Sequence, residues 1–101
     1  HVHIQQMAES AMSMLTESID AFVRKDLLLA RKVMKEDNTV DDLFNQIKTE
    51  VIQEMAQNPD EGELCVDMMM IAKYFERIAD HVVNIAEWVE YSVTGEHKEH
   101  D

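Results

Sequence analysis

The feature that most constrains this sequence is an apolar repeat that continues without a break over residues 64–89. Its members recur alternately four and three residues apart: Leu64, Met68, Ile71, Phe75, Ile78, Val82, Ile85 and Val89. This spacing follows one face of an α-helix and is typical of the contact seam of a helical bundle. A series of smaller side chains runs beside the seam every seven residues: Cys65, Ala72, Ala79 and Ala86. Side chains of this size would let a neighbouring helix approach closely.

Two further helices are predicted upstream, over about residues 4–24 and 26–57, and the seam belongs to a third over about 60–94. Asp26 is expected to cap the second helix, Pro59 to begin the third and Gly95 to end it. Short connections make consecutive helices antiparallel. The sequence therefore predicts an all-α antiparallel three-helix bundle, with one domain over residues 1–95 and a flexible acidic tail over 96–101.

The composition limits the function classes. The chain has 9 basic and 21 acidic residues and a formal charge of −12. A surface of this sign disfavours nucleic acid and anionic lipid, and it suits cations or a basic patch on a partner. No apolar run approaches the roughly 18 residues of a membrane span, and a single cysteine excludes an internal disulfide, which fits a cytoplasmic protein. Because the sequence opens on HVHIQQM rather than on methionine, we expect an upstream segment to be missing.

Two pairs of carboxylates point to a cation site. Glu76 and Asp80 are four residues apart on the third helix and lie opposite its seam; Asp37 and Asp41 have the same spacing on the second. Both pairs lie about 29 Å from the centre of the hairpin between these helices, at about 1.5 Å of rise per residue. Antiparallel packing therefore brings them to one height, where four acids need a cation or bound protons. Oxygen ligands of this kind suit magnesium, calcium, manganese or iron, and also zinc.

Two other interpretations remain open at this stage. Thr39 and Asp42 have the spacing of a capping box, so a helix starting at Thr39 would leave Asp37 in a turn with no ligand role. In the second interpretation, the acidic stripe of the third helix, which includes Glu76 and Asp80, is an ordinary solvated face without a ligand role. Arg77, next to Glu76, would either orient that carboxylate or be solvated itself.

Three segments resemble the PhoU family of phosphate-uptake regulators. The stretch ERIADHVVNIAEWVEYSVTG, preceded by AKYF, is similar to that family's most specific signature. The stretches MAESAMSMLTESIDAFVRKD and KEDNTVDDLFNQI resemble its first- and second-helix motifs, and the similarity extends from about Met7 to Gly95. The resemblance implies the second of two three-helix repeats. It also implies clusters of metal ions, typically iron or zinc, held by paired acidic motifs that match Asp37, Asp41, Glu76 and Asp80; manganese and magnesium are further candidates.

The resemblance also implies a function. It predicts a cytoplasmic negative regulator that acts between a phosphate ABC transporter and a sensor histidine kinase, without catalysis. The sequence contains no Glu-x-x-His motif, P-loop or G-x-S-x-G motif, so we expect no enzyme. We expect a homo-oligomer, because a lone repeat exposes the surface that packs against the other. The alternative is a structural or dimerising helical bundle whose acidic stripe only solubilises it.

Overall fold

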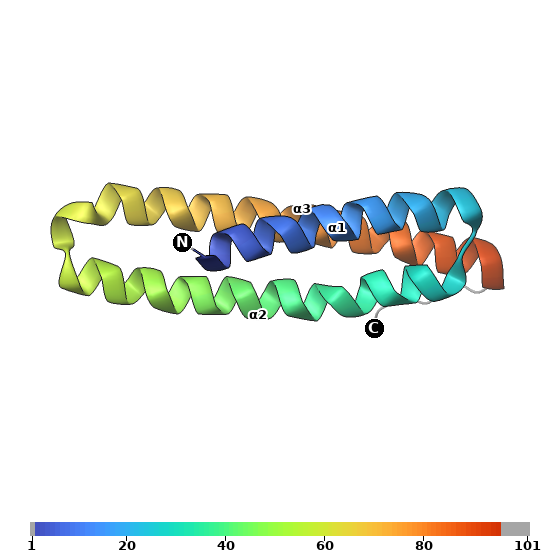
Figure 1. Cartoon of the computed structure of the whole chain (residues 1–101), viewed down its shortest axis with the longest axis horizontal. Helices are drawn as coiled ribbons and strands as arrows, with labels where there is room; N and C mark the ends of the chain where they lie inside the picture. Colours follow the sequence, from blue (N-terminus) through green and yellow to red (C-terminus); the bar gives the residue numbers. More distant parts are fainter. Residues whose placement is uncertain (1, 96–101) are drawn as a thin grey trace.

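The computed structural model describes residues 2–95 and shows the predicted all-α antiparallel bundle. Its helices are α1 (Val2–Arg24), α2 (Leu27–Gln57) and α3 (Gly62–Thr94), with a short 3-10 helix η1 (Pro59–Glu61) between α2 and α3. Figure 1 shows α2 and α3 as a long hairpin with α1 lying along it. Because α1 begins partway along, the turn end of the hairpin projects beyond it. The predicted tail over 96–101 lies outside the described residues.

Backbone hydrogen bonds and capping residues end the helices where the sequence indicated. Lys25 adopts a left-handed conformation (φ 56°), which lets the Asp26 N–H donate to the Ala21 carbonyl at 2.9 Å and closes α1. The Asp26 carboxylate then accepts from the Leu29 N–H at 3.0 Å and caps α2 as predicted. Gly95 ends α3 with φ 72°, and its N–H donates to the Tyr91 carbonyl.

The connection between α2 and α3 differs in detail from the prediction. Pro59 begins η1 rather than α3, because the Glu61 N–H donates back to the Asn58 carbonyl at 3.0 Å in a tight i to i+3 turn. The Asn58 side chain does not cap the next helix; its amide donates to Glu54. The hairpin therefore turns through one 3-10 turn before α3 begins at Gly62.

The buried face of α3 is also rotated from the predicted seam. Leu64 and Ile71 are 50% and 46% exposed, whereas the small series Cys65, Ala72, Ala79 and Ala86 is completely buried, with Val82 and Val89 almost so. The α3 helix packs against both α1 and α2. The strip of its surface that faces both neighbours at once is where the helices come closest, and only small side chains fit there. Larger members of the predicted seam lie along the edge of the core.

The described helices contain no segment with the length and apolar character needed to cross a membrane.

The contact between α1 and α2 is partly ionic. Lys32 on α2 pairs with Glu17 of α1 and with Glu36, and His3 of α1 contacts Glu50 of α2 at 2.7 Å.

Replacing Ala72 with leucine is expected to lower the free energy of unfolding by about 1–3 kcal/mol, because the larger side chain has no room between the helices. Ile71→Ala is the matched control, and its half-exposed side chain is expected to cost about 1 kcal/mol or less. Urea unfolding followed by far-UV circular dichroism measures both. A larger loss for Ile71→Ala than for Ala72→Leu would restore the seam predicted from the sequence.

Candidate metal site

The carboxylates meet because α2 and α3 are continuous helices over the relevant turns. The α2 helix runs unbroken from Leu27 to Gln57, so Asp37 and Asp41 are one turn apart on a single face. No helix restarts at Thr39, which excludes the interpretation that placed Asp37 in a turn. The antiparallel register of the hairpin places these two residues across from Asp80 and Glu76 of α3.

Three of the four predicted residues converge. Asp37, Asp41 and Asp80 each offer one carboxylate oxygen, and these three oxygens lie within 4.8 Å of one another. Asp37 and Asp41 are half-buried, while Asp80 is exposed, so the group opens to solvent from the α3 side. The three residues have the spacing and chemistry to hold a metal ion with oxygen ligands.

Burial and mutual repulsion act on these acids in the same direction. Desolvation raises the pKa of Asp37 to about 6, and the negative charges of Asp41, Asp80 and Glu76 add to the rise. The pKa of Asp41 is also raised, first by burial and then by Glu76 and Asp80, although Lys73 partly opposes this. Carboxyl groups held in this way bind either protons or a cation.

One oxygen of Asp37 provides a direct test of whether the residues suit a metal. Asp37 Oδ1 is buried and has no hydrogen-bond partner among the described residues. Leaving a carboxylate oxygen buried and unpaired is unfavourable, because the group loses its water without gaining a donor. A cation among the three converging oxygens would satisfy that atom, so the residues fit the group that the sequence predicted.

Glu76, the fourth predicted residue, is not among the three whose oxygens converge, although its charge adds to the raised pKa of both Asp37 and Asp41. Its Oε1 lies 2.6 Å from the Lys73 ammonium, one turn earlier on α3, and its side chain is only 15% exposed. Lys73 in turn stands over the Phe44 ring of α2, 5.3 Å from the ring centre. The sequence analysis placed Glu76 opposite the large apolar seam. Because the buried face is centred on the small series instead, Glu76 falls between the buried residues Ala72 and Ala79 in the helical repeat and flanks them on the α2 side.

The sequence analysis considered Arg77 as the basic neighbour of Glu76 and overlooked Lys73. Arg77 is exposed and forms no ion pair with the residues that the structure describes. Residues one apart on a helix point about 100° away from each other, whereas residues three apart are neighbours. The i, i+3 spacing of Lys73 and Glu76 was therefore the signal in the sequence that identified the right partner.

Comparison with known proteins assigns this chain to one family. The family model for the PhoU domain matches residues 4–89. A phosphate-specific transport system accessory protein PhoU homolog from Borreliella burgdorferi is 32% identical over 93 residues, covering 92% of this chain and 42% of the relative. The homolog from Caulobacter vibrioides is 34% identical over 93 residues, covering 92% and 40%, and that from Aquifex aeolicus is 35% identical over 77 residues, covering 76% and 35%.

The chain thus spans about two fifths of the length of these relatives. The match runs through all three helices and includes both acidic pairs, and the relatives that share it all carry the same description. The chain belongs to the PhoU domain family.

Proposed function

We propose that this chain is a metal-binding regulatory module of phosphate uptake. The observation that carries the proposal is the buried, unpartnered oxygen of Asp37 beside carboxylate oxygens of Asp41 and Asp80. Asp37, Asp41 and Asp80 would hold the ion, and Glu76 would join them once released from Lys73. Iron or zinc is the first expectation from the family resemblance, and the all-oxygen donor set also suits manganese or magnesium.

The relatives are named as accessory proteins of a phosphate-specific transport system, which supports a role in phosphate transport for this chain too. In the proposed role the chain acts in the cytoplasm, between a phosphate ABC transporter and a sensor histidine kinase, and damps the response to phosphate starvation. It does so by binding rather than by catalysis. An ion across α2 and α3 would fix the spacing of these helices and hence the shape of the surface they present.

A second candidate function is a dimerising helical bundle. Several large apolar side chains of α1 and α3 are about half exposed or more: Met12, Ile19, Phe22, Leu64, Ile71, Tyr74 and Trp88. Exposed apolar side chains on this scale favour association with another copy. This candidate needs no metal, so the two functions separate in the experiments that follow.

Removing two of the acids is expected to abolish stabilisation by metal. Added Zn²⁺ or Mn²⁺ should raise the melting temperature of the native chain, since a ligand at a hundredfold excess over its Kd adds about 2.7 kcal/mol. In Asp37→Asn/Asp80→Asn this increase should vanish, while the metal-free variant should be at least as stable as the native chain because repulsion is relieved. Differential scanning calorimetry after chelation measures both effects.

The matched control for the metal experiment is Glu9→Gln/Asp67→Asn, which removes the same charge from exposed positions on α1 and α3. It should keep the full response to metal. If the Asp37/Asp80 variant still gains as much as this control, the ion binds elsewhere and the proposed site is wrong.

Stability without metal is expected to depend on pH through Asp37. Between its ordinary value of 3.8 and its raised pKa of about 6, the folded chain keeps a proton that the unfolded chain has released. The free energy of unfolding should therefore fall as pH rises through this window, on the order of 1 kcal/mol after solvent screening. Metal affinity should rise over the same window, because the ion replaces that proton. Urea titrations at several pH values in chelator measure the first effect, and Asp37→Asn, unlike Asp67→Asn, should remove it.

Self-association is expected to depend on the apolar residues of α1 and α3. Sedimentation velocity should show a concentration-dependent oligomer in the native chain, and Ile19→Gln/Ile71→Gln should shift it towards monomer, since each change removes an exposed apolar side chain. A native chain that sediments as a monomer at all concentrations would exclude the dimerising function.

A further inference from the structure

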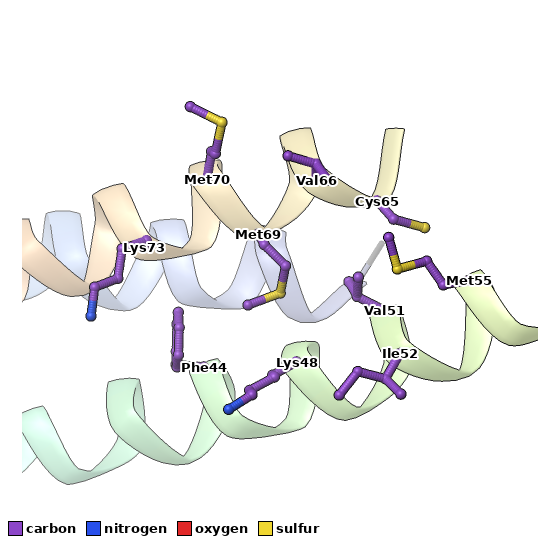
Figure 2. A pocket seen from close by; sticks show the side chains of 10 residues that line it. All are labelled: Phe44, Lys48, Val51, Ile52, Met55, Cys65, Val66, Met69, Met70 and Lys73. Atoms are coloured by element: carbon purple, nitrogen blue, oxygen red, sulfur yellow. The ribbon is translucent and has the colours of Figure 1, made fainter. Parts of the chain in front are cut away.

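The α2–α3 groove contains a second surface with its own chemistry, next to the carboxylates. Between the site and the hairpin turn, an open groove of about 440 Å³ is lined by apolar side chains and two lysines. Val51 and Cys65 form its buried floor, and Ile52, Met55, Val66 and Met70 form rims that are 39–66% exposed. No residue of α1 lines it, and in Figure 2 α1 lies behind the two helices.

The two lysines are at one end of this groove. Figure 2 shows the Lys48 side chain extending towards Phe44, and the Lys73 ammonium lies 5.3 Å from the centre of the Phe44 ring. Phe44 is the lining residue of α2 nearest in sequence to Asp41. Lys48 forms no ion pair with any residue that the structure describes. The only ion pair of Lys73 within that part of the chain is to Glu76. Two lysines and no acidic residue thus line an apolar groove, and of the two Lys48 is left to pair with an acidic group of a ligand.

The shape of the groove decides among possible ligands. The α2 rim from Phe44 to Met55 is about 16 Å long, at about 1.5 Å per residue, which is three helical turns. An acyl chain would remain half in water between rims as exposed as Ile52 and Met70. Self-association is expected to use the exposed apolar residues of α1 and α3, such as Ile19 and Ile71, which leaves this groove to a different partner. A helix places one apolar face into such a groove and keeps its other face in water, and methionines adapt to its side chains.

We infer that this groove binds an amphipathic helix of a partner protein, about three turns long, with acidic side chains beside Lys48 and Lys73. Lys73 then has two competing partners. It pairs with Glu76 when Glu76 is outside the carboxylate group, and it is free for the acidic end of the helix when Glu76 joins Asp37, Asp41 and Asp80. Metal binding and helix binding are therefore expected to favour each other. This coupling rests on the proposed function; the groove itself does not.

The first experiment tests the groove with a labelled synthetic peptide. The peptide is an amphipathic helix with leucines at i, i+3, i+4 and i+7 and two glutamates at one end, and fluorescence anisotropy gives its Kd. Lys48→Glu should weaken binding about tenfold, and a peptide with lysines in place of the glutamates should recover affinity for that variant. Lys48 is exposed and lies two turns, about 10 Å, beyond Asp41 on the same face of α2, so the change leaves the carboxylate ligands themselves in place. Calorimetry with Mn²⁺ on this variant checks that the metal site is intact.

Two double variants distinguish binding in the groove from non-specific hydrophobic binding of the peptide. Ile52→Gln/Met70→Gln should abolish peptide binding, whereas Ile19→Gln/Ile71→Gln, which removes similarly exposed apolar side chains elsewhere, should keep it. Equal losses in both pairs, or a Lys48→Glu variant without effect, would overturn the inference. The inference would also be overturned if sedimentation showed a dimer that dissociates only in Ile52→Gln/Met70→Gln, because the groove would then bind a second copy of the chain.

The second experiment tests the coupling with Mn²⁺ and the same peptide. Calorimetry with Mn²⁺ alone first establishes metal binding to the native chain. The Lys73→Gln variant should bind Mn²⁺ more tightly than the native chain does, because Glu76 loses its competing partner. The control Lys48→Gln should bind Mn²⁺ less tightly than Lys73→Gln. Mn²⁺ should then tighten peptide binding to the native chain about threefold or more, within the usual range of coupling energies. The tightening should disappear in Lys73→Gln.

The outcomes distinguish the two ideas. If Mn²⁺ binds and leaves the peptide Kd unchanged, or if Lys73→Gln responds like the native chain, the coupling is wrong and the proposed metal function stands. If Mn²⁺ does not bind, the coupling and the proposed function both fail, while the charge exchange at Lys48 still decides whether the groove binds a helix.

Discussion

The close approach of α3 to its two neighbours is the constraint on which the rest of the structure depends. It is possible because the centre of the buried face of α3 carries side chains no larger than cysteine at Cys65, Ala72, Ala79 and Ala86. With larger residues there, the helices would move apart and the carboxylates of α2 would no longer reach Asp80. The same contact forms the floor of the apolar groove, where Cys65 is buried beside Val51.

The acids of the site lie where ionised carboxylates are unfavourable unless a cation or a proton neutralises them. Burial and repulsion both raise the pKa of Asp37, and one of its oxygens has no donor among the described residues. Sites that store unfavourable electrostatics of this kind are candidates for function rather than stability. Lys73, which pairs with Glu76 and contacts the Phe44 ring, partly opposes the rise in the pKa of Asp41.

The three outer surfaces of the bundle consequently differ in character. The α1–α2 contact is partly ionic through Lys32, and His3 contacts Glu50 across it. The α1–α3 side presents exposed apolar residues such as Ile19 and Ile71. The α2–α3 groove combines carboxylates with an apolar channel that ends in two lysines. Family membership accounts for the fold.

The sequence by itself determined the three helices, their order, the caps at Asp26 and Gly95 and the equal heights of the two acidic pairs, because helix periodicity and capping are local and hairpin register follows from chain length. It did not determine the rotation of α3, because the apolar repeat there is wide enough to support several buried faces, and contact with both α1 and α2 selects the small series. That rotation put Ile71 at the surface and Glu76 beside the core. Only tertiary structure therefore decided which carboxylates meet, which lysine opposes them, and that the groove beside them remains open.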